Sequence, residues 1–211
     1  MINILLNLSN FDEGWAYPSL EHILTPDKKV LILPLSYDEG WITDAYEWKR
    51  KFGKGRRHDD ETSASDKIES ADVLFFTGGY PHWMMQRLYD LGIQDNIRRF
   101  DGVVMGASAG ACIQLDEFHL PSEDEEPFQY QEGLGLLAGF DIDVHYEEDL
   151  VHVEALIRSL EDMGKPIIAY PNQGGVIIEG DHFELLGGAF VVDVNDLNDL
   201  YDTYDYLRYD I

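Results

Sequence analysis

The apolar residues of this chain gather in short runs that are separated by polar segments. Near-continuous apolar runs bounded by turn residues are typical of strands buried on both faces, as in a parallel sheet. Such runs predict buried strands at residues 2–8, 30–34, 72–76, 103–105 and 166–170. Between and after them, apolar residues at helical spacing predict helices at residues 41–52, 83–91, 93–100, 151–163 and 197–207.

The second half of the chain has a different pattern. Residues 116–135 carry many acids, and we expect a long functional or mobile loop there. Residues 140–144 alternate and predict a strand. Three further runs are separated by glycine turns and predict a terminal antiparallel meander, at residues 175–179, 182–186 and 189–194.

Strands that alternate with helices predict an α/β fold, here a three-layer α/β/α sandwich with a mostly parallel central sheet. The chain has 211 residues and shows no internal repeat, linker or low-complexity block. We therefore expect one domain, residues 1–211.

The most informative pattern is Gly106-Ala107-Ser108-Ala109-Gly110, which follows the predicted strand at 103–105 and precedes a short predicted helix at 111–115. Strand, sharp turn and helix form the context of a nucleophile elbow. The two glycines let strand and helix approach closely, because they lack a Cβ. The Ser108 hydroxyl then points outward at the end of the sheet, and the backbone N–H of Ala109 can stabilise an oxyanion. The alternative is a glycine-rich packing turn.

A second glycine pair, Gly78 and Gly79, follows the predicted strand at 72–76. Backbone N–H groups at the carboxyl ends of parallel strands face the crevice where such sheets bind ligands. We expect this pair to contact substrate and to supply a second oxyanion donor, with a plain tight turn as the alternative. Tyr80 and His82 come next and are candidate substrate contacts, although His82 is equally explained as a surface imidazole.

A serine hydroxyl is a weak nucleophile and needs a base to remove its proton. Of the seven histidines, His145 is the best placed, because it ends the predicted strand at 140–144 on the edge where Ser108 should emerge. A third group, usually a carboxylate, holds such a base in the right tautomer. The acid-rich loop between Ser108 and His145 offers several candidates.

The composition restricts the partners and the compartment. With 41 acidic and 15 basic residues the net charge is −26, so the surface repels nucleic acid and anionic membranes. No apolar run is long enough for a membrane span, and the first residues lack the basic region of a signal peptide. The single cysteine, Cys112, fits a reducing cytoplasm and is expected to be a small core residue. We expect a cytoplasmic protein.

Four segments resemble the dipeptidase E and cyanophycinase family of serine peptidases, whose fold is similar to that of class I glutamine amidotransferases. The segments are Phe76-Thr-Gly-Gly79, Gly106-Ala-Ser-Ala-Gly-Ala111, Asp143-Val-His145 and Ala169-Tyr-Pro-Asn-Gln-Gly174. Their order and spacing follow the family across nearly the whole chain.

The resemblance implies a role for each matching residue. Ser108 is the nucleophile, His145 the general base, and Gly79 and Ala109 the oxyanion donors. Counting from the serine places the acid at Glu123, with Asp124, Glu125 and Glu126 as neighbouring alternatives.

The chain departs from the family at two places near the site. Tyr80-Pro81 stands where the family usually has asparagine, and Asn172-Gln173 replaces an acidic residue. We count Gly78, Tyr80, His82 and Asn172 as candidate substrate-binding residues.

The predicted function is that of a serine peptidase which hydrolyses small, dipeptide-like substrates through a Ser-His-acid triad and an acyl-enzyme. No metal or organic cofactor is expected; a metal reading of His145, Glu147, Glu148 and His152 matches no known zinc spacing. The alternatives are a catalytically silent small-molecule or peptide-binding protein on the same fold, and an amidase or esterase. We expect a monomer or homodimer.

Overall fold

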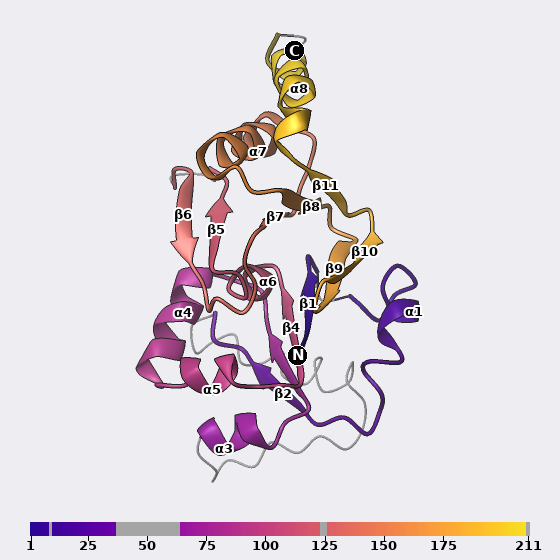
Figure 1. The fold of residues 1–211 in the computed structure, drawn as a ribbon, viewed down its shortest axis with the longest axis vertical. Helices are drawn as coiled ribbons and strands as arrows, with labels where there is room; N and C mark the ends of the chain where they lie inside the picture. The colour runs from indigo at the N-terminus through magenta and orange to yellow at the C-terminus, as the bar shows by residue number, and fades with distance from the viewer. Residues whose placement is uncertain (9, 37–63, 123–125, 210–211) are drawn as a thin grey trace.

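A mostly parallel six-stranded sheet is the centre of the fold (Figure 1). The computed structural model describes residues 1–8, 10–36, 64–122 and 126–209. The sheet has the order β10-β9-β1-β4-β3-β2. Its parallel strands are β1 (Ile2–Leu6), β4 (Val103–Ala107), β3 (Val73–Phe76) and β2 (Val30–Leu33). The antiparallel strands are β9 (Gly174–Glu179) and β10 (His182–Gly187). The predicted mixed α/β fold with a mostly parallel central sheet is confirmed.

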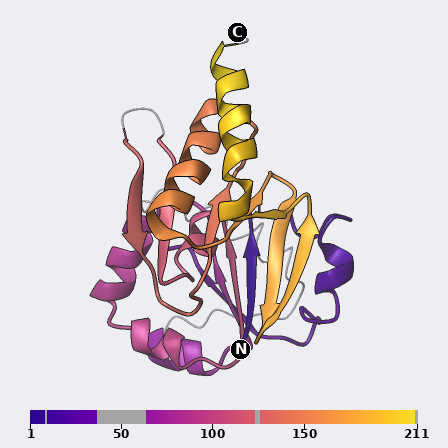
Figure 2. The ribbon, with the colours of Figure 1, turned by 45° about the horizontal axis from the view of Figure 1, so that its top comes forward.

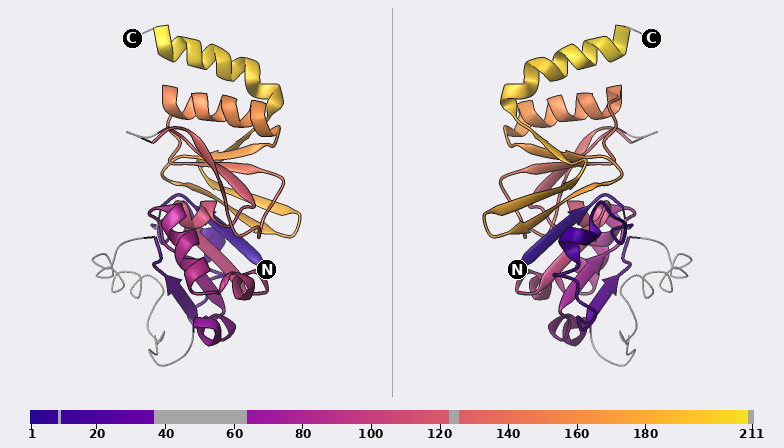
Figure 3. Two further views of the ribbon diagram at one scale, coloured as in Figure 1. Left: turned by 90° about the vertical axis from the view of Figure 1, so that its left-hand side faces the viewer. Right: turned by 90° about the vertical axis from the view of Figure 1, so that its right-hand side faces the viewer.

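A second, three-stranded sheet lies above the first and carries two helices beyond it (Figures 2 and 3). Its order is β11 (Phe190–Val192), β8 (Ile167–Tyr170) and β7 (Asp141–Val144), with β7 and β8 parallel. The helices are α7 (Leu150–Met163) and α8 (Leu197–Tyr209), and the 3-10 turn η2 (Val194–Asp196) leads into α8. α7 and α8 lie at the opposite end of the molecule from β2.

The remaining elements are short. They are the helices α1 (Tyr17–Leu20), α3 (Ala64–Glu69), α4 (Pro81–Asp90), α5 (Gln94–Arg98) and α6 (Ala109–Cys112), and the hairpin strands β5 (Glu117–Leu120) and β6 (Gln129–Glu132). Within the described ranges, the helices are all too short or too polar to cross a bilayer.

The core follows from the alternation of side chains along the strands of the large sheet. On β1, Ile4 and Leu6 face one side and pack with Phe11 and Leu20 from the segment around α1. Leu5 faces the other side and packs under the second sheet. Farther along this second face, apolar residues of β3 and β4 pack under α3, α4 and α5. Burial on both faces explains why these strands have nearly continuous apolar sequences.

The structure corrects two predictions and leaves a third outside its range. Residues 116–135 are not a plain loop, because β5 and β6 pair there as an antiparallel hairpin. The terminal meander is interrupted, because β11 pairs with β8 of the second sheet and not with β10. The predicted helix at 41–52 lies outside the described residues.

A buried polar layer joins β7 to α7 and β5. Asp141 is fully buried, and its carboxylate accepts hydrogen bonds from His119 Nδ1 and from the Ser159 hydroxyl, both at 2.7 Å. Two residues farther along the same face of β7, the buried Asp143 carboxylate contacts His152 Nδ1 at 3.0 Å. β7 therefore packs on α7 through paired ionisable side chains, and the residue after it is His145.

The charges of this layer depend on each other. Burial by itself lowers the pKa of His119, but the charge of Asp141 and the hydrogen bond to it outweigh burial and raise the pKa above its ordinary value. Burial in turn raises the pKa of Asp141, and His119 and Ser159 more than reverse this, so that the pKa is lowered. Below the raised pKa of His119, the two groups form an ion pair inside the protein.

We predict that the His119–Asp141 pair makes stability depend on pH. The raised pKa of His119 gives stabilisation that is complete below about pH 6.5 and is lost as pH rises through the folded-state value. The lowered pKa of Asp141 gives stabilisation that is complete above about pH 3.9 and is lost on further acidification. Urea unfolding should therefore show that His119→Gln costs about 3–5 kcal/mol near pH 5.5 and less near pH 9.

His182→Gln is the matched control, because His182 is exposed on the edge strand β10. It should change the free energy of unfolding by less than about 0.5 kcal/mol at both pH values. An equal cost of His119→Gln at pH 5.5 and pH 9 would show that the pair is not ionic.

Candidate active site

Ser108 occupies a strained turn between β4 and α6. Its backbone has φ 51° and ψ −116°, a conformation that L-residues rarely adopt. A Cβ on Gly106 would collide with the backbone of Gly110, and a Cβ on Gly110 would collide with the backbone of Phe76 in β3. Both glycines are therefore required for the close approach of α6 to the sheet. Although Ser108 stands at the N-cap of α6, its hydroxyl caps no helix N–H.

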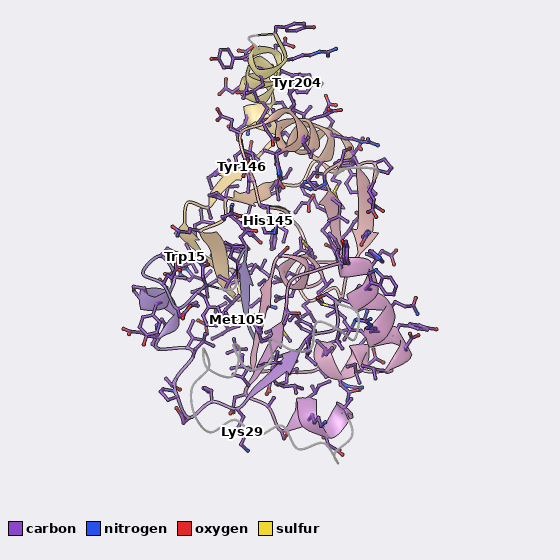
Figure 4. All side chains as sticks on the ribbon, turned by 180° about the vertical axis from the view of Figure 1, so that it is seen from behind. Trp15, Lys29, Met105, His145, Tyr146 and Tyr204 are labelled. Carbon is purple, nitrogen blue, oxygen red and sulfur yellow. The ribbon has the colours of Figure 1, made fainter. Side chains whose placement is uncertain are left out.

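The Ser108 hydroxyl is instead hydrogen bonded to an imidazole. His145 Nε2 lies 2.9 Å from Ser108 Oγ. His145 follows directly after β7 and also has a positive φ, 61°. In Figure 4 it lies between the large sheet, where Met105 is labelled, and the upper layers of the fold. The second sheet thus brings the imidazole to the carboxyl end of β4, as the sequence predicts.

Among the residues that the structure describes, the other nitrogen of the imidazole contacts an amide. His145 Nδ1 lies 3.2 Å from Asn172 Oδ1. Asn172, one of the candidate substrate-binding residues, belongs to the loop between β8 and β9. The predicted acid, Glu123, lies outside the described residues together with Asp124 and Glu125. Glu126 is described, and its exposed carboxylate accepts a hydrogen bond from Gln129 at 3.5 Å.

Asn7, a buried residue directly after β1, also contributes to the site, although the sequence did not indicate it. Asn7 Oδ1 accepts a hydrogen bond from the backbone N–H of His145 at 2.9 Å, and Asn7 Nδ2 donates to Asn172 Oδ1 at 3.3 Å. Its side chain therefore touches both the backbone of His145 and the amide that contacts the His145 ring. Asn7 falls inside the strand predicted at residues 2–8, and a polar residue near a strand end is ordinary, so the sequence carried no signal for this contact.

The glycine pair after β3 lies next to Ser108, because β3 and β4 are paired with Phe76 opposite Gly106. The buried Ser36 hydroxyl donates a hydrogen bond to the carbonyl of Gly78. Since C=O and N–H point in opposite directions in a trans peptide, this bond directs the N–H of Gly79 away from Ser36. Gly79 has φ 125°, which favours glycine.

The other candidate substrate contacts lie at the start of α4, on the same edge of the sheet. Tyr80 is 59% exposed, and its ring centroid is 5.8 Å from that of His82. His82 in turn lies 5.6 Å from Trp83, which is also exposed. These three rings form an aromatic group open to solvent.

The metal alternative gains no support from the geometry. His152, one of its proposed ligands, directs Nδ1 at the buried Asp143. In the parts of the chain that the structure describes, groups of three or more histidine, cysteine or acidic side chains arranged for a metal ion are absent.

Cys112 lies in α6, four residues after Ser108, and is buried. Burial raises the pKa of its thiol well above the ordinary value, and the nearby charges of Asp141 and Asp143 add to the effect. Because the thiolate is the reactive form of cysteine, Cys112 is chemically inert in the folded protein. The prediction of a buried core cysteine is confirmed.

We therefore predict that iodoacetamide does not modify the native protein at pH 8 and modifies it fully in denaturing urea. Because Cys112 is the single cysteine, the mass of the intact protein reports on this residue alone. Rapid alkylation of the folded chain, at the rate seen in urea, would contradict the burial of this thiol.

An elbow serine in contact with a histidine, at the end of a mostly parallel sheet, is typical of enzymes that use a serine nucleophile. The model of Peptidase family S51 matches residues 55–186, which is more than half of the 211 residues. The chain belongs to peptidase family S51 and is a serine-type peptidase.

Solved structures agree with this fold. A peptidase from an acI-B1 Actinobacterium has a TM-score of 0.61 at 17% identity, with 92% of this chain and 90% of that chain covered. A candidate peptidase E from Listeria monocytogenes has a TM-score of 0.59 at 16% identity, with 92% and 100% covered. No curated protein matches the sequence significantly.

Proposed function

We propose that this protein hydrolyses short, dipeptide-like substrates with Ser108 as nucleophile, His145 as general base and Asn172 as the residue that orients the base. The observation that carries the proposal is the 2.9 Å contact between Ser108 Oγ and His145 Nε2 at a strained elbow. Strained serine backbones of this kind persist where the surroundings impose them, and they cluster at active sites.

The reaction is acyl transfer. Ser108 Oγ attacks the carbonyl carbon of the scissile peptide bond while its proton moves to His145 Nε2. The backbone N–H groups of Gly79 and Ala109 receive the negative oxygen of the tetrahedral intermediate. The proton then passes from His145 to the leaving amine, and the C–N bond breaks to give an acyl-enzyme. Water, activated by the same imidazole, hydrolyses the ester and restores Ser108.

The residue that contacts the second ring nitrogen of His145 is an amide, and an amide acts differently there from a carboxylate. Asn172 Oδ1 accepts a hydrogen bond from His145 Nδ1–H, which holds the ring and its tautomer in place. It carries no charge, so it stabilises the imidazolium of the transition state less than a carboxylate does. Orientation is therefore the main contribution that we assign to Asn172.

The charge of the chain favours some peptides over others. Glu147 and Glu148 follow His145 closely and are exposed, and the net charge of the chain is −26. Such a field attracts the free ammonium group of a short peptide and repels acidic side chains. We propose substrates with a free amino terminus and a neutral or basic side chain.

We predict that Ser108→Ala lowers peptide hydrolysis by at least about 10³-fold, because the acyl-enzyme cannot form. The assay is a panel of dipeptides and tripeptides beside simple esters, which also separates a peptidase from an esterase. In parallel, a fluorophosphonate probe should form an adduct that peptide mass spectrometry places on Ser108.

Ser70→Ala is the control, because Ser70 lies at the exposed end of α3 and should leave turnover and labelling unchanged. The free energy of unfolding of both variants should lie within about 1 kcal/mol of the wild-type value. Absence of the adduct at Ser108 in the folded wild-type protein would refute the proposed function and favour a silent binding protein.

We also predict that Asn172→Asp moves the acid limb of the kcat/KM profile to higher pH by about one unit, because a carboxylate beside the ring favours the protonated, inactive imidazole. Gln173→Glu is the matched control: it adds the same charge one residue away, next to Glu13 and not in contact with His145. An equal displacement by both variants would mean that Asn172 acts through net charge and not through its contact with the ring.

A further inference from the structure

We propose that Asn7 is a positioning residue that sets the tautomer of His145, by fixing which end of the Asn172 amide faces the imidazole. The inference rests on the proposed function, and it assigns a role to a residue that lies outside the serine, histidine and asparagine of the site. Asn7 acts through Asn172 and His145, the two residues to which its side chain is hydrogen bonded.

Asn7 is held firmly by its own backbone. It is 1% exposed, and its N–H donates a hydrogen bond to the carbonyl of Gly174 at 3.0 Å. The preceding residue, Leu6, accepts a hydrogen bond from the N–H of Ser108 at 2.8 Å. The end of β1 is thus tied to β9 on one side and to the nucleophile elbow on the other.

The orientation of the Asn7 side chain follows from one group that can only donate. The backbone N–H of His145 points at the Asn7 amide from 2.9 Å, so the amide atom that faces it must be the oxygen. Asn7 Nδ2 then occupies the opposite end of the amide, 3.3 Å from Asn172. Because Nδ2 is a donor, the atom of Asn172 that faces it must be Oδ1.

The same Asn172 oxygen faces the imidazole. Oδ1 can only accept, so His145 Nδ1, 3.2 Å away, must carry a proton. In the neutral ring Nε2 then has a free lone pair, and this is the nitrogen that lies 2.9 Å from the Ser108 hydroxyl. A fixed backbone N–H therefore determines, through two side-chain amides, which ring nitrogen can receive the serine proton.

Asn172 needs Asn7 to orient it because the residue that contacts His145 Nδ1 is an amide. An ionised carboxylate accepts with both oxygens, so it selects the Nδ1–H tautomer whichever way it is turned. An asparagine has a donor end and an acceptor end. If Asn172 turned its Nδ2 toward the ring, it would favour the Nε2–H tautomer, which cannot accept a proton from Ser108. Asn172 is also exposed, so burial does not fix its orientation.

The decisive variant is Asn7→Asp, which keeps the acceptor for the His145 N–H and removes the donor to Asn172. Asn172 should then turn its Nδ2 toward the introduced carboxylate, and the same Nδ2 should face the imidazole ring. As a result, the proton of neutral His145 should move from Nδ1 to Nε2. Nitrogen-15 NMR of protein labelled in its histidines, at a pH where the ring is neutral, distinguishes the two tautomers. The rate of fluorophosphonate labelling at Ser108 should fall by about 10²–10⁴-fold.

A second variant removes the influence of Asn7 without adding a buried charge. Asn7→Leu should leave both orientations of Asn172 accessible and give a mixture of tautomers. Adding Asn172→Asp to Asn7→Leu should restore the Nδ1–H tautomer and recover labelling at least tenfold over Asn7→Leu alone, because a carboxylate needs no orientation. A purely structural role of Asn7 predicts no such rescue.

Asn3 provides the matched controls. It lies on β1, four residues before Asn7, is 4% exposed, and donates to the side chain of Gln114 at 3.0 Å, away from the site. Asn3→Asp and Asn3→Leu should leave the His145 tautomer and the labelling rate unchanged.

Three results would overturn the inference: Nε2–H in the wild type, Nδ1–H retained in folded Asn7→Asp, or Nδ1–H retained in Asn7→Leu. The wild-type spectrum decides the first even if a variant fails to fold. If Ser108 resists the probe in wild-type protein, the proposed function fails, while the tautomer measurements still test the role of Asn7.

Discussion

The end of β1 is the constraint on which the site depends. At Leu6 a main-chain carbonyl receives the N–H of Ser108, and at Asn7 a side-chain oxygen receives the N–H of His145. These two N–H groups belong to the two residues of the chain, other than glycine, that have a positive φ in the described ranges. Two strained residues from different sheets are therefore held against neighbouring positions of one rigid strand, which keeps their side chains in contact.

The buried polar layer between β7, α7 and β5 also limits the position of His145. Buried ion pairs contribute little net stability compared with apolar packing, but they demand a defined arrangement, because breaking one leaves a buried charge without a partner. Asp141 connects β7 to both β5 and α7, and Asp143 adds a second connection to α7. Sliding β7 along its neighbours would break both connections. Since His145 follows β7 directly, the layer limits where the imidazole can lie.

The sequence predicted what depends on local pattern. The parallel strands, the elbow at Ser108 and the position of His145 at a strand end follow from apolar runs and glycine spacing, and the structure has them. It did not predict the β5–β6 hairpin, because burial does not alternate along these strands: the consecutive residues Phe118 and His119 are both buried on β5, and β6 has no buried residue. The partner of β11 and the contacts of Asn7 and Asn172 depend on segments far apart in the chain, and a single sequence carries no direct signal for such pairs.

In the proposed site, Asn172 is a neutral partner of the imidazole in a chain that is strongly negative overall. A carboxylate beside the imidazole both orients the ring and supplies a negative charge, whereas Asn172 only orients it. In this protein a net charge of −26 provides a negative field around the site. That field is spread over the surface and is screened over about 8–10 Å at physiological salt, so it cannot choose one ring nitrogen over the other. The choice of nitrogen requires short, directional contacts, and the amides of Asn7 and Asn172 are placed to make them.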